Sequence, residues 1–131
     1  MTAPMGYQAY QQNTVNSKAA SASPQELVVM LCDAFLDNLD RIEGQIEEKD
    51  FERKGETVKR CIDILAGLDI NLDMENGGQL AQDLHNLYDH MRVRLHQISL
   101  KNDVSGLQEI RDIMTNLRDG WQGLGSLPES A

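Results

Sequence analysis

Hydrophobic residues recur at spacings of three and four along most of the chain, and this periodicity predicts helices. No stretch shows the strict alternation of a β-strand, and no proline occurs between Pro24 and Pro128. Because the connections between the expected helices are short, consecutive helices should run antiparallel. We therefore predict an all-α fold, an antiparallel up-down four-helix bundle. Its helices are expected over about 24–49, 51–72, 79–100 and 103–121.

Residues that cap or interrupt helices stand at these boundaries. In the segment Ser23-Pro24-Gln25-Glu26, a serine is followed by a proline and, three residues on, by a glutamate. This order predicts a capping box between Ser23 and Glu26 at the start of the first helix. Asp50 is placed to cap the second helix, Gly77-Gly78 separates the second from the third, and Asn102-Asp103 is expected to cap the last. We then expect the chain to divide into an N-terminal arm or short helix (1–22) that packs as a lid, the bundle (23–122) and a flexible tail (123–131).

Three of the helices carry one narrow apolar stripe, as expected of helices that bury one face in a bundle. We interpret these stripes as the core. They comprise Phe51, Val58, Cys61, Ile62, Leu65, Leu68 and Leu72 in the second helix; Leu80, Leu84, Leu87, Tyr88, Met91, Leu95 and Ile98 in the third; and Leu107, Ile110, Ile113, Met114, Leu117 and Trp121 in the last.

The first helix differs between its two halves. Its second half carries a narrow stripe, whereas residues 27–36 are apolar nearly all round, with Asp33 as the only charged side chain. A helix that is apolar all round needs cover on every side. Val29, Met30 and Leu36 are expected to point away from the core stripe, so something other than the bundle must cover them.

Two interpretations of this extra apolar face stay open. The arm, whose apolar residues include Tyr7, Tyr10 and Val15, either covers the face permanently or forms a removable lid over a partner-binding groove. Tyr7 and Tyr10 are three residues apart, so both rings can dock from one face of a helical turn.

Composition narrows the function classes. The 131 residues include 12 Lys and Arg against 21 Asp and Glu, a net charge of −9, so phosphate backbones are repelled and no nucleic-acid partner is expected. The longest purely apolar run, Leu27 to Cys32, is far too short to cross a membrane. Residues 1–17 carry no charge, unlike a secretory signal, and only two cysteines occur. We therefore predict a cytoplasmic protein without membrane insertion.

The histidines do not fit a metal site. His85 and His96 share one side of the third helix but lie roughly 16 Å apart along its axis, too far to bind one ion. No Glu-x-x-His pair, Walker loop or Gly-x-Ser-x-Gly motif occurs. We expect no metal, no cofactor and no enzymatic activity. His96 with Lys101 leaves a histidine phosphotransfer bundle as an alternative, although Asn102 stands where a glycine is expected.

Several short motifs follow one another in a distinctive order. They are the arm with Tyr7, Tyr10, Gln12 and Asn13; Ser23-Pro24-x-x-Leu27; Met30-Leu31; Leu72-Asp73-Met74-Glu75-x-Gly77-Gly78-x-Leu80-Ala81; Leu87-Tyr88; and Leu117-Arg118-x-x-Trp121. Together they resemble the FliS family of flagellar secretion chaperones. The resemblance extends from about Tyr7 to Trp121, and its specificity lies in the combination of the arm, the Ser-Pro start and the Gly-Gly turn.

The resemblance implies a cytoplasmic chaperone that binds the C-terminal segment of flagellin in apolar grooves of the bundle. It implies that this segment becomes helical when bound, and that the arm covers part of the site when no flagellin is present. It also implies contacts with an export-gate component and an anti-sigma factor. Together with the extra apolar face, it gives as candidate partner-binding residues Tyr7, Tyr10, Gln12, Asn13, Val15, Leu27, Val29, Met30, Leu31 and Leu36.

A further alternative to a chaperone is a structural bundle. In that case the same apolar face would pair with a second copy of the chain. Binding of a flagellin peptide, labelling of His96 by a phosphodonor and dimer formation at micromolar concentration would separate the three hypotheses.

Overall fold

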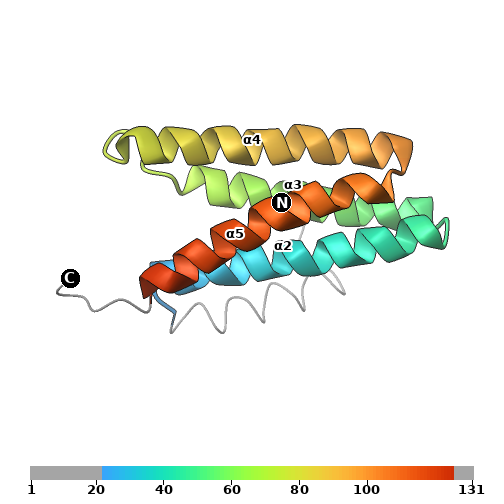
Figure 1. Ribbon diagram of the computed structural model, residues 1–131, viewed down its shortest axis with the longest axis horizontal. Helices are drawn as coiled ribbons and strands as arrows, with labels where there is room; N and C mark the ends of the chain where they lie inside the picture. Colours follow the sequence, from blue (N-terminus) through green and yellow to red (C-terminus); the bar gives the residue numbers. More distant parts are fainter. Residues whose placement is uncertain (1–21, 126–131) are drawn as a thin grey trace, which may run out of the picture.

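The computed structural model describes residues 22–125, which fold into a bundle of four long helices (Figure 1). Consecutive long helices run in opposite directions, which confirms the predicted all-α up-down bundle. Apart from Ala22, the predicted arm lies outside the described residues. The elements are α2 (Pro24–Glu47), α3 (Phe51–Ile70), α4 (Gly78–Lys101), the short 3₁₀ helix η1 (Val104–Gly106) and α5 (Leu107–Gly125).

The predicted capping signals at the starts of α2 and α3 are confirmed. The Glu26 backbone N–H donates to Ser23 Oγ at 3.1 Å, and the Ser23 N–H donates back to Glu26 Oε1 at 3.3 Å. The Asp50 carboxylate accepts a hydrogen bond from the Arg53 N–H at 3.3 Å. These bonds satisfy amides that have no partner within the helix.

The last helix differs from its predicted bounds at both ends. Asp103 caps η1 instead of a long helix, accepting from the Ser105 N–H at 3.1 Å, and α5 begins only at Leu107. Gly106 permits the tight passage between η1 and α5, because a Cβ there would lie 2.8 Å from Ile98 Cγ1. At its other end α5 continues to Gly125, so the first residues of the predicted tail are helical.

The helices do not pack equally against one another. α2 packs against both α3 and α5, whereas α4 packs mainly against α3. Figure 1 shows α5 starting beside the end of α4 and crossing away from it toward the start of α2. Two consequences follow: α4 and α5 diverge, and the end of α5 lies beside the beginning of α2.

The core occupies the space between all four helices and contains most of the predicted stripes. Phe51 and Leu80 are exceptions: 45% and 65% of their surfaces are exposed, so assigning them to the core was wrong. Each lies in the first turn of its helix, at an end of the bundle where the facing helices give less cover. The buried apolar residues are Cys32, Phe35, Leu39, Ile42, Ile46, Val58, Cys61, Leu65, Leu68, Ala81, Leu84, Tyr88, Met91, Leu95, Ile98, Leu107, Ile110 and Met114.

One buried charge joins α3 to α4. The Lys54 ammonium donates to the Ser99 carbonyl at 2.8 Å and to the Ser99 hydroxyl at 3.2 Å. These partners lie in the last turn of α4, where the helix dipole favours a cation. Lys54 therefore fixes the start of α3 against the end of α4.

Candidate partner-binding groove

The start of α2 and the end of α5 enclose a groove of about 500 Å³, which we call the α2–α5 groove. Val29 and Met30 from α2 and Trp121 from α5 supply its apolar lining. The remaining lining residues are polar or charged, so the groove combines an apolar surface with hydrogen-bonding groups. They are Ser23, Gln25, Glu26, Asp33, Arg118 and Gln122.

The register of α2 directs different residues to the core and to the groove. Val28 and Leu31 pack against the buried core cluster, whereas Val29 and Met30 are half-buried and line the groove. Because the capping box at Ser23 fixes where α2 begins, it also fixes the position of these side chains one to two turns later. The extra apolar face predicted for this half of α2 is therefore present at Val29 and Met30.

An ion pair ties the two helices together beside the groove. Arg118 Nε of α5 lies 2.7 Å from Asp33 Oδ1 of α2, and the Arg118 guanidinium also donates to Gln122 Oε1. The hydrogen bond and the charge of Asp33 raise the pKa of Arg118 above its usual value. The single charged residue in the apolar half of α2 thus has a defined partner on the opposite wall.

Half of the predicted partner-binding residues can be placed in the structure. Val29 and Met30 line the groove, and Leu27 is half-buried near the start of α2. Leu31 and Leu36 pack against the core, so the expectation that Leu36 points away from it was wrong. Since α2 is flanked by two helices, its buried arc is wider than one stripe. Tyr7, Tyr10, Gln12, Asn13 and Val15 lie outside the described residues.

The sequence pattern did not predict the α5 side of the groove. Trp121 was interpreted only as core, but it both packs against the core and lines the groove. The antiparallel topology contained the relevant signal, because it places the end of the last helix beside the start of the first. The opposite charges of Asp33 and Arg118 were a second signal that these two segments lie side by side.

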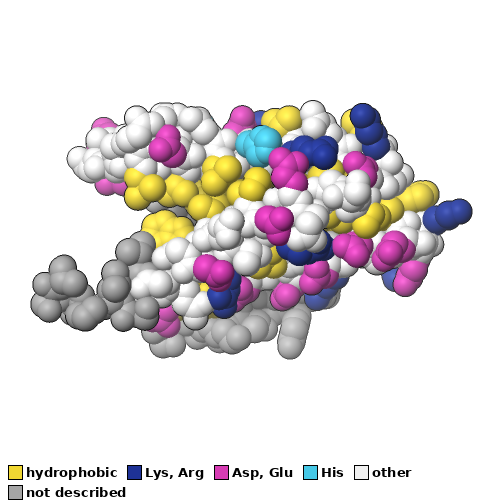
Figure 2. Space-filling model, viewed as in Figure 1, with side chains coloured by type: hydrophobic (Ala, Val, Ile, Leu, Met, Phe, Trp, Pro, Cys, Tyr) yellow, Lys and Arg dark blue, Asp and Glu magenta, His cyan; other side chains and the backbone are white. Residues whose placement is uncertain are grey.

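Apolar surface continues from the groove along the seam between α4 and α5. Figure 2 shows hydrophobic side chains gathered in this seam, on the side where the two helices diverge. The half-buried apolar residues of α4 and α5 that pack against the core are Leu87, Ile113, Leu117 and Trp121. Trp121 lines the groove and also packs against this core.

Reactive and titratable groups elsewhere have structural roles. His85 Nδ1 lies 2.7 Å from Asp69 Oδ1 on α3, and His90 Nε2 lies 3.1 Å from Glu109 Oε2 on α5. Each histidine thus links α4 to a neighbouring helix through a side-chain contact. Among residues 22–125, no group of three or more His, Cys, Asp and Glu side chains is arranged to hold a metal ion. Within the same range, no helix combines the length and apolar character that crossing a bilayer requires.

The two cysteines are buried in the bundle. Burial, reinforced by the charge of Asp33, raises the pKa of the Cys32 thiol to about 11. Burial raises the pKa of the Cys61 thiol to about 12. Because the thiolate is the reactive form, both side chains behave as small hydrophobic groups at neutral pH.

Comparison with known proteins decides the family. The family model described as "Flagellar protein FliS" matches residues 6–127. The chain belongs to the FliS family. It is 40% identical to the flagellar secretion chaperone FliS of Escherichia coli K12 over 93% of this chain and 90% of that protein. It is 38% identical to the FliS of Salmonella typhimurium LT2, covering 89% and 87% of the two chains.

The same fold also occurs among solved structures. A crystal structure of a flagellar chaperone from bacteria aligns with a TM-score of 0.74, covering 88% of this chain and 94% of that chain, at 16% identity. The resemblance found from the sequence motifs is confirmed, and FliS membership indicates a role in flagellar secretion that requires no catalysis. The FliS match includes both helices of the groove and begins within the predicted arm.

Proposed function

We propose that this FliS-family chain is a cytoplasmic export chaperone whose α2–α5 groove binds the C-terminal helical segment of flagellin. The observation that carries the proposal is the placement of Val29, Met30 and Trp121 in one groove rather than inside the core. Apolar side chains that a bundle leaves half-covered at one end are suited to a partner helix.

The groove fits an amphipathic helix. Such a helix inserts apolar side chains that recur at i, i+3, i+4 and i+7, while its polar face stays in water. In this mode Met30 and Trp121 contact the apolar face of the flagellin segment, and Arg118 and Gln122 offer hydrogen bonds at its margin. The half-buried Leu87 of α4 and Leu117 of α5 offer further apolar contacts to a longer segment.

Binding of this kind explains how a chaperone delays polymerisation. An exposed amphipathic segment of flagellin would otherwise pack against other flagellin molecules. A segment that is disordered alone pays a conformational entropy cost when it becomes helical, which lowers its affinity for a given contact area. A modest affinity allows the chaperone to release flagellin when export begins.

The N-terminal arm is proposed to act as a lid and as part of the binding surface. Tyr7, Tyr10, Gln12, Asn13 and Val15 are the residues assigned to this role. A lid competes with flagellin, so deleting residues 1–17 should raise the affinity or the association rate by a factor set by how often the lid is closed. Tyr10→Ala should instead weaken binding, because the ring also contacts bound flagellin.

Calorimetric titration with a peptide of the flagellin C-terminal segment tests the proposal. A one-to-one complex is expected with this peptide and none with a peptide of the same composition in scrambled order. Absence of binding, combined with a dimer at micromolar concentration, would favour the self-associating bundle. Transfer of phosphate to His96 from a phosphodonor would favour a signalling bundle.

A further inference from the structure

The turn between α3 and α4 leaves three large apolar side chains exposed at one end of the bundle. Ile70 is 82% exposed, Met74 49% and Leu80 65%. Figure 1 shows this turn at the end of the bundle where α2 begins and α5 ends. None of the three residues lines the α2–α5 groove. We call the surface that they form the turn surface.

The turn holds these side chains in a defined place. The Asp73 carboxylate accepts hydrogen bonds from the Asn76 N–H at 3.0 Å and from Asn76 Nδ2 at 3.2 Å, and the Gly77 N–H donates to the Asp73 carbonyl at 2.7 Å. A Cβ at Gly77 would lie 2.4 Å from that carbonyl oxygen, so a larger residue would displace the turn. Asp69 Oδ1 lies 2.7 Å from His85 Nδ1, which links the end of α3 to α4. A surface that is already ordered binds a partner with less loss of conformational entropy.

The segment that forms the turn surface carries charge of one sign. Residues 61–91 contain six acidic side chains and no Lys or Arg, so they account for six of the nine net negative charges of the chain. Hydrogen bonds from Asn76 hold the pKa of Asp73 below its usual value, so this carboxylate is ionised at neutral pH. The six acidic residues are Asp63, Asp69, Asp73, Glu75, Asp83 and Asp89.

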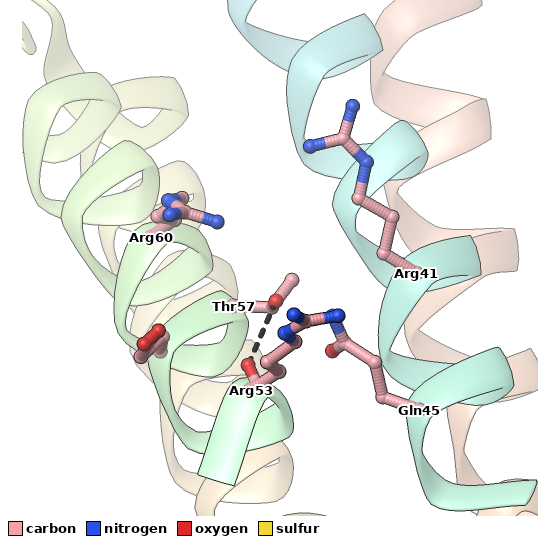
Figure 3. A pocket seen from close by; sticks show the side chains of 6 residues that line it. Arg41, Gln45, Arg53, Thr57 and Arg60 are labelled. Atoms are coloured by element: carbon pink, nitrogen blue, oxygen red, sulfur yellow. Dashed lines mark hydrogen bonds between the residues drawn. The ribbon is translucent and has the colours of Figure 1, made fainter. Parts of the chain in front are cut away.

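The other half of the bundle contains most of the basic residues. Figure 3 shows Arg41, Arg53 and Arg60 around a pocket between α2 and α3. Leu100, at the end of α4, is 85% exposed but is followed in the chain by Lys101. Exposed apolar residues therefore occur in both halves, and the turn surface is distinguished by the absence of Lys and Arg from the segment that forms it.

We propose that the turn surface binds a basic amphipathic helix of a protein partner. Such a helix brings apolar side chains to Ile70, Met74 and Leu80, and it places Lys or Arg side chains beside carboxylates such as Glu75 and Asp83. Charge complementarity of this kind raises the association rate and discriminates against acidic partners. A second copy of this chain would bring the same negative charge to the contact, and the acidic surface repels nucleic acid and anionic lipid.

A fluorescein-labelled synthetic helix with leucines at i, i+3, i+4 and i+7 and lysines on its remaining face is a direct probe. We expect fluorescence anisotropy to show saturable binding that weakens as salt is raised, and at least tenfold weaker binding of a scrambled peptide of the same composition. Ile70→Ser combined with Leu80→Ser should reduce the affinity at least tenfold. Glu75→Gln combined with Asp83→Asn should reduce it at least threefold at low salt. Because all four side chains are exposed, thermal unfolding should stay close to that of the parent chain.

Matched variants in the other half of the bundle make the test specific. Leu100→Ser removes an exposed apolar side chain and should leave peptide binding unchanged. Glu47→Gln combined with Glu48→Gln removes two exposed charges and should change the affinity less than twofold. Equal binding of the two peptides, equal loss in Leu100→Ser, or a dimer of the parent chain that the Ile70/Leu80 double variant no longer forms would each overturn the inference.

The flagellin peptide separates the turn surface from the α2–α5 groove. It should bind the Ile70/Leu80 double variant normally, and Met30→Asp should leave binding of the lysine peptide unchanged. Since the lysine peptide is measured without flagellin, its binding does not depend on the function proposed for the groove. Loss of flagellin binding in the double variant would make the turn surface part of the flagellin site and overturn its assignment to a separate partner.

Discussion

Apolar residues in the two halves of α2 play different parts in the molecule. Leu39 and Ile42 in the second half have no exposed surface, whereas Val29 and Met30 in the first half are half-buried and line the groove. The side chains are of the same kind. What differs is the cover that α3 and α5 provide, so the surroundings of an apolar residue decide whether it holds the fold or binds a partner.

The largest expected effect comes from a charge in the covered half. Leu39→Asp places a carboxylate without a partner in the centre of the core, and we expect a loss of more than about 4 kcal/mol in the free energy of unfolding. Circular dichroism during denaturant unfolding measures this. If the Leu39→Asp variant folded with near-normal stability, the second half of α2 would not be the part of the helix that holds the core together.

Alkaline pH should destabilise the core that α2 and α3 share. The pKa of Cys32 is raised from 9.0 to about 11 and that of Cys61 from 9.0 to about 12, so the folded state holds both thiol protons more tightly than the unfolded state does. The resulting stability is complete below pH 9 and is lost as the pH rises from 9 through about 12, with each thiol contributing about 1.4 kcal/mol for every unit by which its pKa is raised. Denaturant unfolding at a series of pH values measures the loss.

A cysteine variant is the control for this pH dependence. Cys61→Ala should be somewhat less stable than the parent chain at pH 8, because it leaves a small cavity. It should lose less additional stability between pH 9 and 12. An identical alkaline loss in both proteins would show that the buried thiols do not cause it.

A smaller effect is expected at the capping box that positions the groove. Ser23→Ala removes the acceptor for the Glu26 N–H and should cost about 1 kcal/mol of stability. It should also weaken flagellin-peptide binding a few-fold, because the first turn of α2 frays. Asp50→Ala removes the cap of α3, away from the groove, and should cost similar stability without weakening binding. If both variants lost the same binding affinity, the capping box at Ser23 would have no special role in positioning the groove.

The smallest effect should come from the histidines of α4. Replacing His85, His90 and His96 together by glutamine keeps hydrogen-bonding capacity and changes no residue of the α2–α5 groove. We expect flagellin-peptide affinity to stay within twofold and to be insensitive to a metal chelator. A drop of more than tenfold in calorimetric titration would reveal a site on α4 that the groove does not include.

The fold was largely predictable because its signals are local. Periodicity gives the helices, and Ser23 and Asp50 mark two of the starts. The groove depends on how distant segments meet. Trp121 lines one groove with Met30 because α5 starts at Leu107 and then crosses toward the start of α2. That course depends on η1 and on Gly106, and helical periodicity does not reveal it.

The same reason explains the position of Leu36. Leu36 was expected to face outward because one stripe was assumed for α2, but two flanking helices widen its buried arc. Pairing between helices, unlike helix formation, is a property of the assembled bundle.

The central claim is that Met30 and Trp121 form a flagellin-binding groove outside the core. Trp121 is the only tryptophan of the chain, so its fluorescence reports directly on the groove. Titration with a tryptophan-free flagellin C-terminal peptide should shift the emission to shorter wavelength and saturate. Met30→Asp should weaken this response at least tenfold while leaving thermal unfolding nearly unchanged.

Met74→Asp is the matched control, since Met74 is 49% exposed and lies outside the groove, and it should respond like the parent chain. If calorimetry detects peptide binding while Trp121 emission stays unchanged, or if Met74→Asp weakens binding as much as Met30→Asp, the groove is not the binding site.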